Sequence, residues 1–401
     1  MYYQNGEFRY QINYLRLLYG PLLKMEIIRN LKTKKVIRTA GLMTGTSMDG
    51  LDISIADIGL SNNTVDFNVI GTTSIPYPSD LQSQVRQAVN DGTTKNNSEL
   101  NHDLGIWYTV KLSEYLQSES IDNIELIGSH GQTIHHVSGQ STLQIGDPSP
   151  LAEKFNIPVI SDFRTADICA GGTGAPLMPR VDEWLFRNID NAIITLNLGG
   201  IANVTFLPCT NNGDVIGFDT GPGMALLDET FLLETNEGID VGGEFALKGN
   251  ADKTLVNKWL KAPYFLQLPP KSTGRDQFGI DWLADHRQEL GSLAIVDQLA
   301  TLSLFTAKSV FLACEEFIRD HQVGRVIISG GGIHHKCVMK YLIKCFNPIS
   351  VVPSDQLGVS VDGKEALGFA MLAVAHIKSI PGNIPSVTGA KKALVLGKIT
   401  L

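Results

Sequence analysis

Residues 41–52 read GLMTGTSMDGLD, and this stretch predicts a strand, a tight turn and a second strand. Apolar Val36–Ile37 lead into it, and Leu51, Ile53 and Ile55 alternate with polar residues after the turn. The glycines of the turn let the backbone approach an anion closely, and the neighbouring hydroxyl groups can donate hydrogen bonds. The stretch predicts an anion-binding hairpin; its plainer interpretation is an ordinary Gly-Thr-Ser hairpin.

Two carboxylates accompany this turn, those of Asp49 and Asp52. They would repel a phosphate group unless a cation lay between, so they suggest Mg2+ and are the candidate metal ligands. The candidate nucleotide-binding residues of this turn are Gly45, Thr46, Ser47, Met48, Asp49, Gly50, Leu51 and Asp52.

Two further glycine clusters repeat the pattern. Residues 196–207, LNLGGIANVTFL, run from an apolar strand through Gly-Gly into an alternating strand, and residues 326–335, VIISGGGIHH, follow a buried-type strand. Together the clusters suggest a duplicated nucleotide-binding architecture. A P-loop or Rossmann site is disfavoured, because the chain has neither a Walker A sequence nor a GxGxxG opening a helix after the first strand. The candidate residues here are Gly199, Gly200, Asn203, Gly330, Gly331 and Gly332.

The length, net charge and cysteine content of the chain disfavour several classes of protein. The chain has 401 residues, enough for two domains, and its formal net charge of −8 argues against a nucleic-acid surface. Five scattered cysteines without a CxxC pair indicate reduced thiols in a cytoplasmic protein. We find no apolar run approaching the roughly 20 residues that a membrane-spanning helix needs, so no membrane association is expected.

Residues 1–35 differ from the rest in being strongly basic. The preferred interpretation is a non-catalytic extension, with Met25 as an alternative start; a mitochondrial-type targeting segment is the alternative. Farther along, helical periodicity predicts helices over residues 79–90, 97–117 and 296–320. Strands alternating with helices predict α/β layers, and the Gly/Pro-rich residues 170–180 are a candidate hinge.

Eight motifs occur in one order along the chain, and together they resemble the anhydro-N-acetylmuramic acid kinases. They are GTSMDGLD, SHGQTI, DFR, AGG-x-GAPL, NLGGIANVT, GFDTGPG, KSTGRD and SGGG. The resemblance extends from Val36 to the C-terminus and implies the superfamily of actin, hexokinase and heat-shock chaperone ATPases. It implies an α/β fold with two domains of duplicated actin-like (ribonuclease H-like) topology and ATP in an interdomain cleft. We expect domain I to hold residues 36–165 and 381–401, and domain II residues 166–380.

The resemblance also implies the reaction. Water opens the 1,6-anhydro ring of 1,6-anhydro-N-acetylmuramic acid while the freed O6 takes the γ-phosphoryl group of ATP. The products would be N-acetylmuramic acid 6-phosphate and ADP, in peptidoglycan recycling and amino-sugar catabolism. The first hairpin would cradle the β- and γ-phosphates with Mg2+ on Asp49 or Asp52, the second would hold phosphate from the other domain, and Gly330–Gly332 would lie against adenosine.

Two carboxylates match catalytic positions of the family. The aspartate matching Asp219 is the family's catalytic base, which would take a proton from the attacking water. The glutamate matching Glu365 lies at the sugar site. Taken alone, Asp219 also fits an Asx-type turn, and Glu365 fits a first-turn acid favoured by the helix dipole.

Polar residues near two other motifs are candidates for binding the sugar. Arg164 can hold the lactyl carboxylate bidentately, or instead pair with Asp162 or Asp167. Arg275 can meet an anion or fix a loop. The candidate substrate residues are His130, Gln132, Thr133 and Arg164, of which Gln132 and Thr133 offer neutral hydrogen bonds to sugar hydroxyls. His130 also fits a buried core imidazole or, with His135 and His136, a zinc site, although no further ligand is evident.

The chain departs from the family pattern at two histidines. His135 and His335 stand where many relatives have Arg and Asn, which bears on contacts to the sugar and to adenosine. Asp182 follows the GAPL loop but does not match the family's base. Three alternatives remain: a related sugar kinase acting on a free hydroxyl without ring hydrolysis, a non-catalytic ATP-binding module, and a zinc hydrolase. The expected partners are a small-molecule sugar and ATP, without nucleic acid, and the expected assembly is a homodimer.

Overall fold

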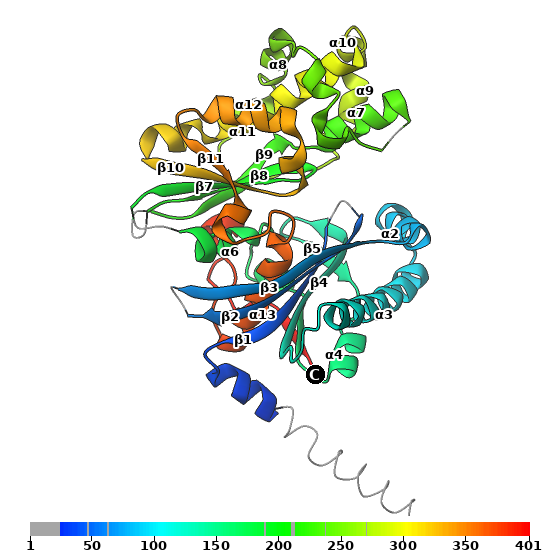
Figure 1. Cartoon of the computed structure of the whole chain (residues 1–401), viewed down its shortest axis with the longest axis vertical. Helices are drawn as coiled ribbons and strands as arrows, with labels where there is room; N and C mark the ends of the chain where they lie inside the picture. Colours follow the sequence, from blue (N-terminus) through cyan, green and yellow to red (C-terminus); the bar gives the residue numbers. More distant parts are fainter. Residues whose placement is uncertain are drawn as a thin grey trace, which may run out of the picture.

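Two β-sheets organise the chain in the computed structural model, which describes residues 25–45, 48–61, 64–187, 190–209, 213–236, 238–269 and 271–401 (Figure 1). The first sheet contains β1 (Ile37–Thr44), β2 (Gly50–Leu60), β3 (Val65–Pro76), β4 (Leu126–Val137), β5 (Ser141–Ile145), β6 (Val159–Ser161) and β12 (Lys398–Thr400). The second contains β7 (Ala192–Leu198), β8 (Ile201–Leu207), β9 (Ile216–Pro222), β10 (Val323–Ser329) and β11 (Ser350–Pro353).

Both sheets repeat one strand order. The first runs β6-β4-β1-β2-β3 and the second runs β11-β10-β7-β8-β9. In each, three consecutive strands form an antiparallel meander, and two later strands add in parallel beside the first strand of that meander. β12 extends the first sheet beside β6, and β5 pairs with β4. The predicted fold class, α/β with two halves of duplicated actin-like topology, is confirmed.

The three glycine-bearing units have the predicted form. β1 and β2 are an antiparallel hairpin in which Leu42 faces Ile53, and β7 and β8 form the second hairpin, with Leu196 facing Val204. The third cluster follows β10 and leads through a 3-10 turn, η4 (Gly331–His334), into α12 (Lys336–Phe346).

Helices cover both sheets. The predicted helices appear as α2 (Ser79–Asp91), α3 (Thr94–Ser118) and α11 (Ile295–Asp320). Around the second sheet lie α7 (Ala225–Thr235), α8 (Lys253–Trp259), α9 (Ile280–Asp285), α10 (Arg287–Leu290) and α12. The others are α4 (Ser149–Phe155), α5 (Thr165–Cys169), α6 (Met178–Phe186), α13 (Lys364–Lys378) and α14 (Pro385–Thr388), with 3-10 turns η1 (Val241–Gly243), η2 (Ala246–Lys248), η3 (Pro263–Leu266) and η5 (Ser354–Leu357).

Helix α11 corrects the expectation that no apolar segment of the chain approaches the length of a membrane-spanning helix. Among the residues that the structure describes, it is the helix that is long and apolar enough, by length and composition, to cross a membrane. However, 67% of that window is buried, and the helix packs between the second sheet and α12. Its apolar surface is therefore used in the core of this half.

Helix α13 joins the two halves. Nearly all its side chains are buried, in a cluster that combines residues of β1, β2 and β4 with Ile193, Leu207 and Ile327 of the second sheet. The helix backbone lies directly on the first sheet, because a Cβ at Gly41 would stand 1.8 Å from the carbonyl oxygen of Ala366. By packing, α13 lies with the first sheet, whereas the predicted domain II includes it; the domain boundaries stay a prediction.

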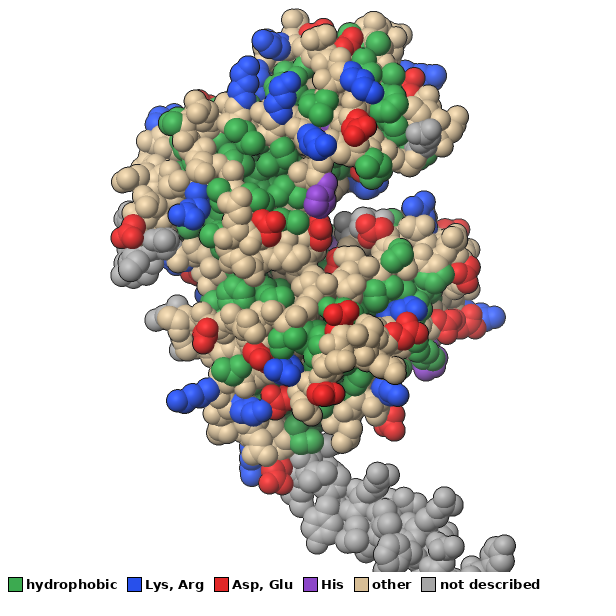
Figure 2. Space-filling model, viewed as in Figure 1, with side chains coloured by type: hydrophobic (Ala, Val, Ile, Leu, Met, Phe, Trp, Pro, Cys, Tyr) green, Lys and Arg blue, Asp and Glu red, His purple; other side chains and the backbone are tan. Residues whose placement is uncertain are grey.

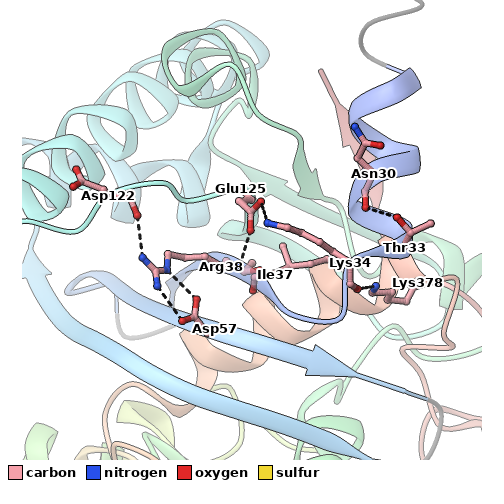
Figure 3. Close-up of polar contacts among 10 residues, drawn as sticks. Asn30, Thr33, Lys34, Ile37, Arg38, Asp57, Asp122, Glu125 and Lys378 are labelled. Carbon is pink, nitrogen blue, oxygen red and sulfur yellow. Dashed lines mark hydrogen bonds and ion pairs between the residues drawn. The ribbon is translucent and has the colours of Figure 1, made fainter.

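The described part of the N-terminal extension begins with a helix over residues 25–33, which packs on the first half (Figure 3). Leu31 of this helix is buried in the cluster around α13. Lys34 pairs with Glu125, while Lys378 at the end of α13 donates to the backbone oxygens of Lys32 and Lys34. The extension is thus attached to α13 at the end of the helix remote from Lys364.

Candidate active site

Hydrogen bonds from three neighbouring residues hold the first glycine turn in place. Gln132 of β4 donates to the carbonyl oxygen of Gly45 at 3.1 Å, and Gln82 of α2 donates to that of Met48 at 2.9 Å. The amide of Tyr77 donates to the carbonyl oxygen of Asp49 at 2.9 Å. Three carbonyl groups are thereby occupied, so the turn is pre-shaped before any ligand arrives. Met48 has a left-handed φ of 55°. The candidates Thr46 and Ser47 lie outside the described residues.

Acidic side chains gather beside this turn. Ser74 donates to Asp52 Oδ1 at 2.5 Å, but burial and, after it, the charges of Asp49, Glu365 and Asp362 together raise the pKa of Asp52 to about 6. A cation among these carboxylates would relieve the repulsion. Among the described residues, no three His, Cys, Asp or Glu side chains are grouped to hold a metal ion. The residues that could hold Mg2+ here are Asp49 and Asp52, since this ion is usually bound by one or two carboxylates together with phosphates and water.

Three other predicted residues near this turn, Leu51, Gln132 and Thr133, contact other parts of the protein. Leu51 is buried in the core. Gln132 is also buried; besides its bond to Gly45 it accepts from Tyr77 Oη and donates to the carbonyl oxygen of Thr133. Gln144 donates to Thr133 Oγ1 at 3.2 Å. Contact of the sugar with Gln132 or Thr133 stays a prediction, and the observed contacts of Gln132 hold the turn.

The second glycine turn supports the start of α7. The Gly199 oxygen accepts from the amide of Met224 at 2.8 Å, and the Gly200 oxygen accepts from those of Gly223 and Ala225. A Cβ at Gly223 would lie 2.2 Å from the Gly199 oxygen, so only glycine fits there. Asn203, the remaining candidate on this hairpin, faces Asp219 in the register of β8 and β9.

The Asp219 carboxylate lies on β9 and is held through one oxygen. Its Oδ2 accepts from Ser272 Oγ at 2.8 Å and from the amide of Thr273 at 3.0 Å. No described residue donates to Oδ1. Burial raises the pKa of Asp219, against the effect of those two donors. The interpretation as an Asx-type turn is wrong, because the side chain bonds to a distant loop rather than to its own turn.

Glu365 brings the two halves together. It lies in the first turn of α13, and Asn197 of β7 donates to its Oε1 at 3.1 Å. Burial raises the pKa of Glu365, and the charges of Lys364 and Arg164 oppose that shift. Sequence reasoning missed Asn197, although it lies in the NLGGIANVT motif.

A buried ion pair lies next to Glu365. Lys364 Nζ donates to Asp182 Oδ1 at 2.8 Å, and both side chains are only 3% exposed. Thr195 and Thr205 of the second sheet donate to Asp182 Oδ2 at 2.7 and 2.9 Å. With both oxygens hydrogen-bonded inside the protein and the side chain buried, Asp182 connects α6, α13 and the second sheet.

Arg164 and His130 form a buried pair in the first half. Arg164 Nε donates to His130 Nε2 at 3.0 Å, and Arg164 Nη1 donates to the carbonyl oxygen of Gly174 at 3.0 Å. The neutral His130 ring therefore carries its proton on Nδ1. Burial, followed by the Arg164 charge, lowers the pKa of His130 well below its usual value, and burial lowers that of Arg164 to about 10.

Neither suggested ion pair of Arg164 forms. Asp162 pairs with Lys398 and accepts from Thr165, while Asp167 accepts from Gly174 N, Asn383 and Thr388. His135 and His136 donate to or accept from Ser141 and Thr142, and neither belongs to a group of metal-binding side chains among the described residues. Contact of Arg164 with the sugar carboxylate stays a prediction.

The third glycine cluster contacts the second hairpin. A Cβ at Gly332 would stand 2.5 Å from Leu198, whereas one at Gly331 meets nothing within 4 Å, so the backbone at Gly331 is open to a ligand. Gly330 has φ 88° and donates to the Val361 oxygen. His335 is buried and caps α12, since its Nδ1 accepts from the amide of Val338 at 3.3 Å.

Polar residues of the two hairpins approach Glu365, where the two halves join. Asn197 of the second sheet donates a hydrogen bond to Glu365. Asp52 of the first sheet lies close enough to Glu365 for the charge of that carboxylate to raise the pKa of Asp52. Figure 2 shows a hollow between the two lobes of the molecule, with acidic side chains along its edge. The arrangement can bring a polyphosphate, a cation and a basic carboxylate together.

Comparisons with known proteins find one family over most of the chain. The model of the family "Anhydro-N-acetylmuramic acid kinase" matches residues 37–401. A protein of that name from Salinibacter ruber is 36% identical over 378 residues, covering 90% of this chain and 95% of the relative. Another from Coxiella burnetii is 39% identical over 373 residues, covering 90% and 97%.

Solved structures are more distant. A dehydratase activator from Clostridium difficile with bound ADPNP has a TM-score of 0.42 at 14% identity, covering 86% of this chain and 96% of that one. A ROK family glucokinase from Streptomyces griseus has a TM-score of 0.37 at 12% identity, covering 84% and 99%.

Proposed function

Because the chain belongs to the anhydro-N-acetylmuramic acid kinase family, and is thus a phosphotransferase that uses ATP, we propose that it couples ring hydrolysis to phosphorylation. The substrate is 1,6-anhydro-N-acetylmuramic acid, and the products are N-acetylmuramic acid 6-phosphate and ADP. The observation that carries the proposal is the Asp219 carboxylate, which has one oxygen fixed by two donors and the other without a donor from the described residues.

The proposed step conserves atoms and charge. The oxygen of a water molecule bonds to the anomeric carbon as Asp219 Oδ1 accepts its proton, and the bond from that carbon to O6 breaks. O6 then bonds to the γ-phosphorus, and the bond from that phosphorus to the β-phosphate oxygen breaks to release ADP. The raised pKa of Asp219 makes its carboxylate a stronger base than that of an exposed aspartate.

Other residues of the site orient the two substrates. The turn from Gly45 to Gly50 and the turn at Gly199–Gly200 receive phosphates, and Gly330–Gly332 lies against adenosine. Mg2+, when bound at Asp49 and Asp52, neutralises phosphate charge. Glu365 hydrogen-bonds the sugar, held in place by Asn197. Arg164 with His130 faces the lactyl carboxylate. We also propose a cytoplasmic location and a homodimeric state.

The test uses labelled water and two sugars. Purified protein is given ATP, Mg2+ and either the 1,6-anhydro sugar or the ring-opened N-acetylmuramic acid, in H2¹⁸O. We expect a phosphorylated product from the anhydro sugar with one ¹⁸O at the anomeric carbon and none in the phosphate. Faster phosphorylation of the ring-opened sugar would instead support the alternative, a kinase acting on a free hydroxyl.

A further inference from the structure

The side chain of Arg275 lies over the second glycine turn. A Cβ added at Gly200 would stand 3.3 Å from Arg275 Nη2 and 3.5 Å from Nε. The absence of a side chain at Gly200 thus leaves room for the guanidinium edge formed by Nε and Nη2. The side chain is 48% exposed, so a ligand can reach it.

The guanidinium group of Arg275 is hydrogen-bonded to the described protein groups through Nη1 and not through Nε or Nη2. Nη1 donates to Glu229 Oε1 at 3.2 Å. No described residue accepts a hydrogen bond from Nε or Nη2. These two nitrogens form one of the edges through which a guanidinium binds carboxylate or phosphate in a bidentate manner. The edge suited to an oxyanion is therefore unoccupied by the described protein groups and lies at the turn expected to receive phosphate.

The loop that carries Arg275 is tied to the catalytic carboxylate. Ser272 and Thr273, three and two residues earlier, are the donors to Asp219 Oδ2. The loop is fixed within itself as well, since Thr273 Oγ1 donates to Gln277 and the Phe278 amide donates to the Gly274 oxygen. One short loop therefore positions both the base and a cation at the second glycine turn.

The charge of the site calls for such a cation. Asp49, Glu365 and Asp362 lie close enough to raise the pKa of Asp52, and ATP adds several more negative charges. Lys364 is buried and paired with Asp182, and Arg164, which donates to His130 and Gly174, is assigned to the sugar carboxylate in the proposed function. Arg275 is paired through one nitrogen only, and a fixed cation of this kind lowers the barrier to phosphoryl transfer.

We propose that Arg275 binds the terminal phosphates of the nucleotide through Nε and Nη2, while Glu229 holds Nη1. This inference rests on the proposed function and adds a phosphate-binding residue to the same site. Arg275 thereby becomes a catalytic residue contributed by the loop that also orients Asp219.

The experiment measures nucleotide binding without sugar. Calorimetry compares adenosine with a non-hydrolysable ATP analogue in the wild type, Arg275→Ala and Arg275→Lys. Loss of charged hydrogen bonds should weaken binding of the analogue by roughly 10- to 100-fold in Arg275→Ala, with adenosine unchanged. Arg275→Lys should recover only part of this, because a point charge lacks the two-pronged geometry. Arg319→Ala removes an exposed arginine, paired with Asp320, and serves as the matched control.

The outcomes separate this proposal from the proposed function. Unchanged affinity of Arg275→Ala for the analogue would overturn the assignment, as would an equal loss for adenosine and the analogue, which would indicate a collapsed loop. Added guanidinium ion should restore turnover to Arg275→Ala and not to an Asp219 variant. A wild type that binds the analogue in this way but fails to phosphorylate the anhydro sugar would overturn the proposed function and leave the Arg275 assignment standing.

Discussion

The two oxygens of the Asp219 carboxylate have different hydrogen-bond partners, and this difference gives them different roles. Oδ2 is held by Ser272 and Thr273, which sets the direction of the side chain, while Oδ1 has no donor among the described residues. A base that abstracts a proton from water needs such an arrangement, since it must be aimed and must keep one lone pair available. Asp182, whose oxygens are all bonded inside the protein, lacks that property.

Replacement of Asp219 by asparagine tests this assignment. Asn keeps the shape of the side chain but cannot take the proton, so we expect kcat to fall by roughly 10²–10⁴-fold. Binding of ATP and of the sugar should change little, because the interaction belongs to the transition state. Asp281→Asn, an exposed aspartate of α9, is the control for an equivalent change outside the site. Near-normal turnover in Asp219→Asn would contradict the role.

The raised pKa of Asp52 predicts how stability depends on pH. With a folded-state pKa of about 6, above the value of an exposed aspartate, the native state binds the proton more tightly than the unfolded state. Stability should therefore fall as the pH rises from about 4 to 6, and Asp52→Asn should remove that loss. We expect a higher melting temperature for Asp52→Asn than for wild type at pH 8 without Mg2+, and no difference below pH 4. Added Mg2+ should stabilise wild type more than the variant.

At the scale of elements, α13 carries the contacts that fix the geometry between the sheets. Its first turn supplies Lys364 to Asp182 and Glu365 to Asn197, and its backbone lies on Gly41. A helix apolar on all sides can be stable only when it is surrounded, and here both sheets surround it. The position of Glu365 thus depends on packing along the whole helix.

Breaking the buried pair should be strongly destabilising. Lys364→Met leaves the Asp182 charge buried with only two hydroxyl donors, and removal of one partner of such a pair costs about 3–5 kcal/mol. Unfolding in urea measures the effect. The exposed Lys258, paired with Glu289, provides the comparison, since Lys258→Met should cost at most about 1 kcal/mol. A similar small loss in Lys364→Met would show that the pair contributes little.

Local patterns in the sequence predicted elements well, and contacts between distant residues poorly. The glycine hairpins and α2, α3 and α11 follow from alternation and helical period, which are properties of neighbouring residues. The Asn197–Glu365 contact joins residues 168 positions apart, and no periodicity encodes it. Arg164 was expected near a carboxylate, yet it bonds His130, because packing of β4 against α13 decides which polar group it reaches.

At the scale of the whole molecule, the N-terminal extension precedes the part of the chain that the family model matches. The family match begins at residue 37, and the helix over residues 25–33 packs against the far end of α13. Deletion of residues 1–35 should lower the free energy of unfolding by about 2 kcal/mol or more, from exposure of the Leu31 site alone. The kcat should stay unchanged. A large loss of activity in a folded deletion variant would show that the extension acts on the site.

The strand order shared by the two sheets also has an evolutionary meaning. Doubling of one ancestral half would leave this arrangement, with a glycine hairpin at the start of each copy. The copies differ most between their third and fourth strands, where the first holds α2 and α3 and the second holds α7 to α11 with the loop of Ser272 and Arg275. The two glycine hairpins are thus the part that both copies share, and the loop that holds the Asp219 side chain belongs to the segment in which the copies differ.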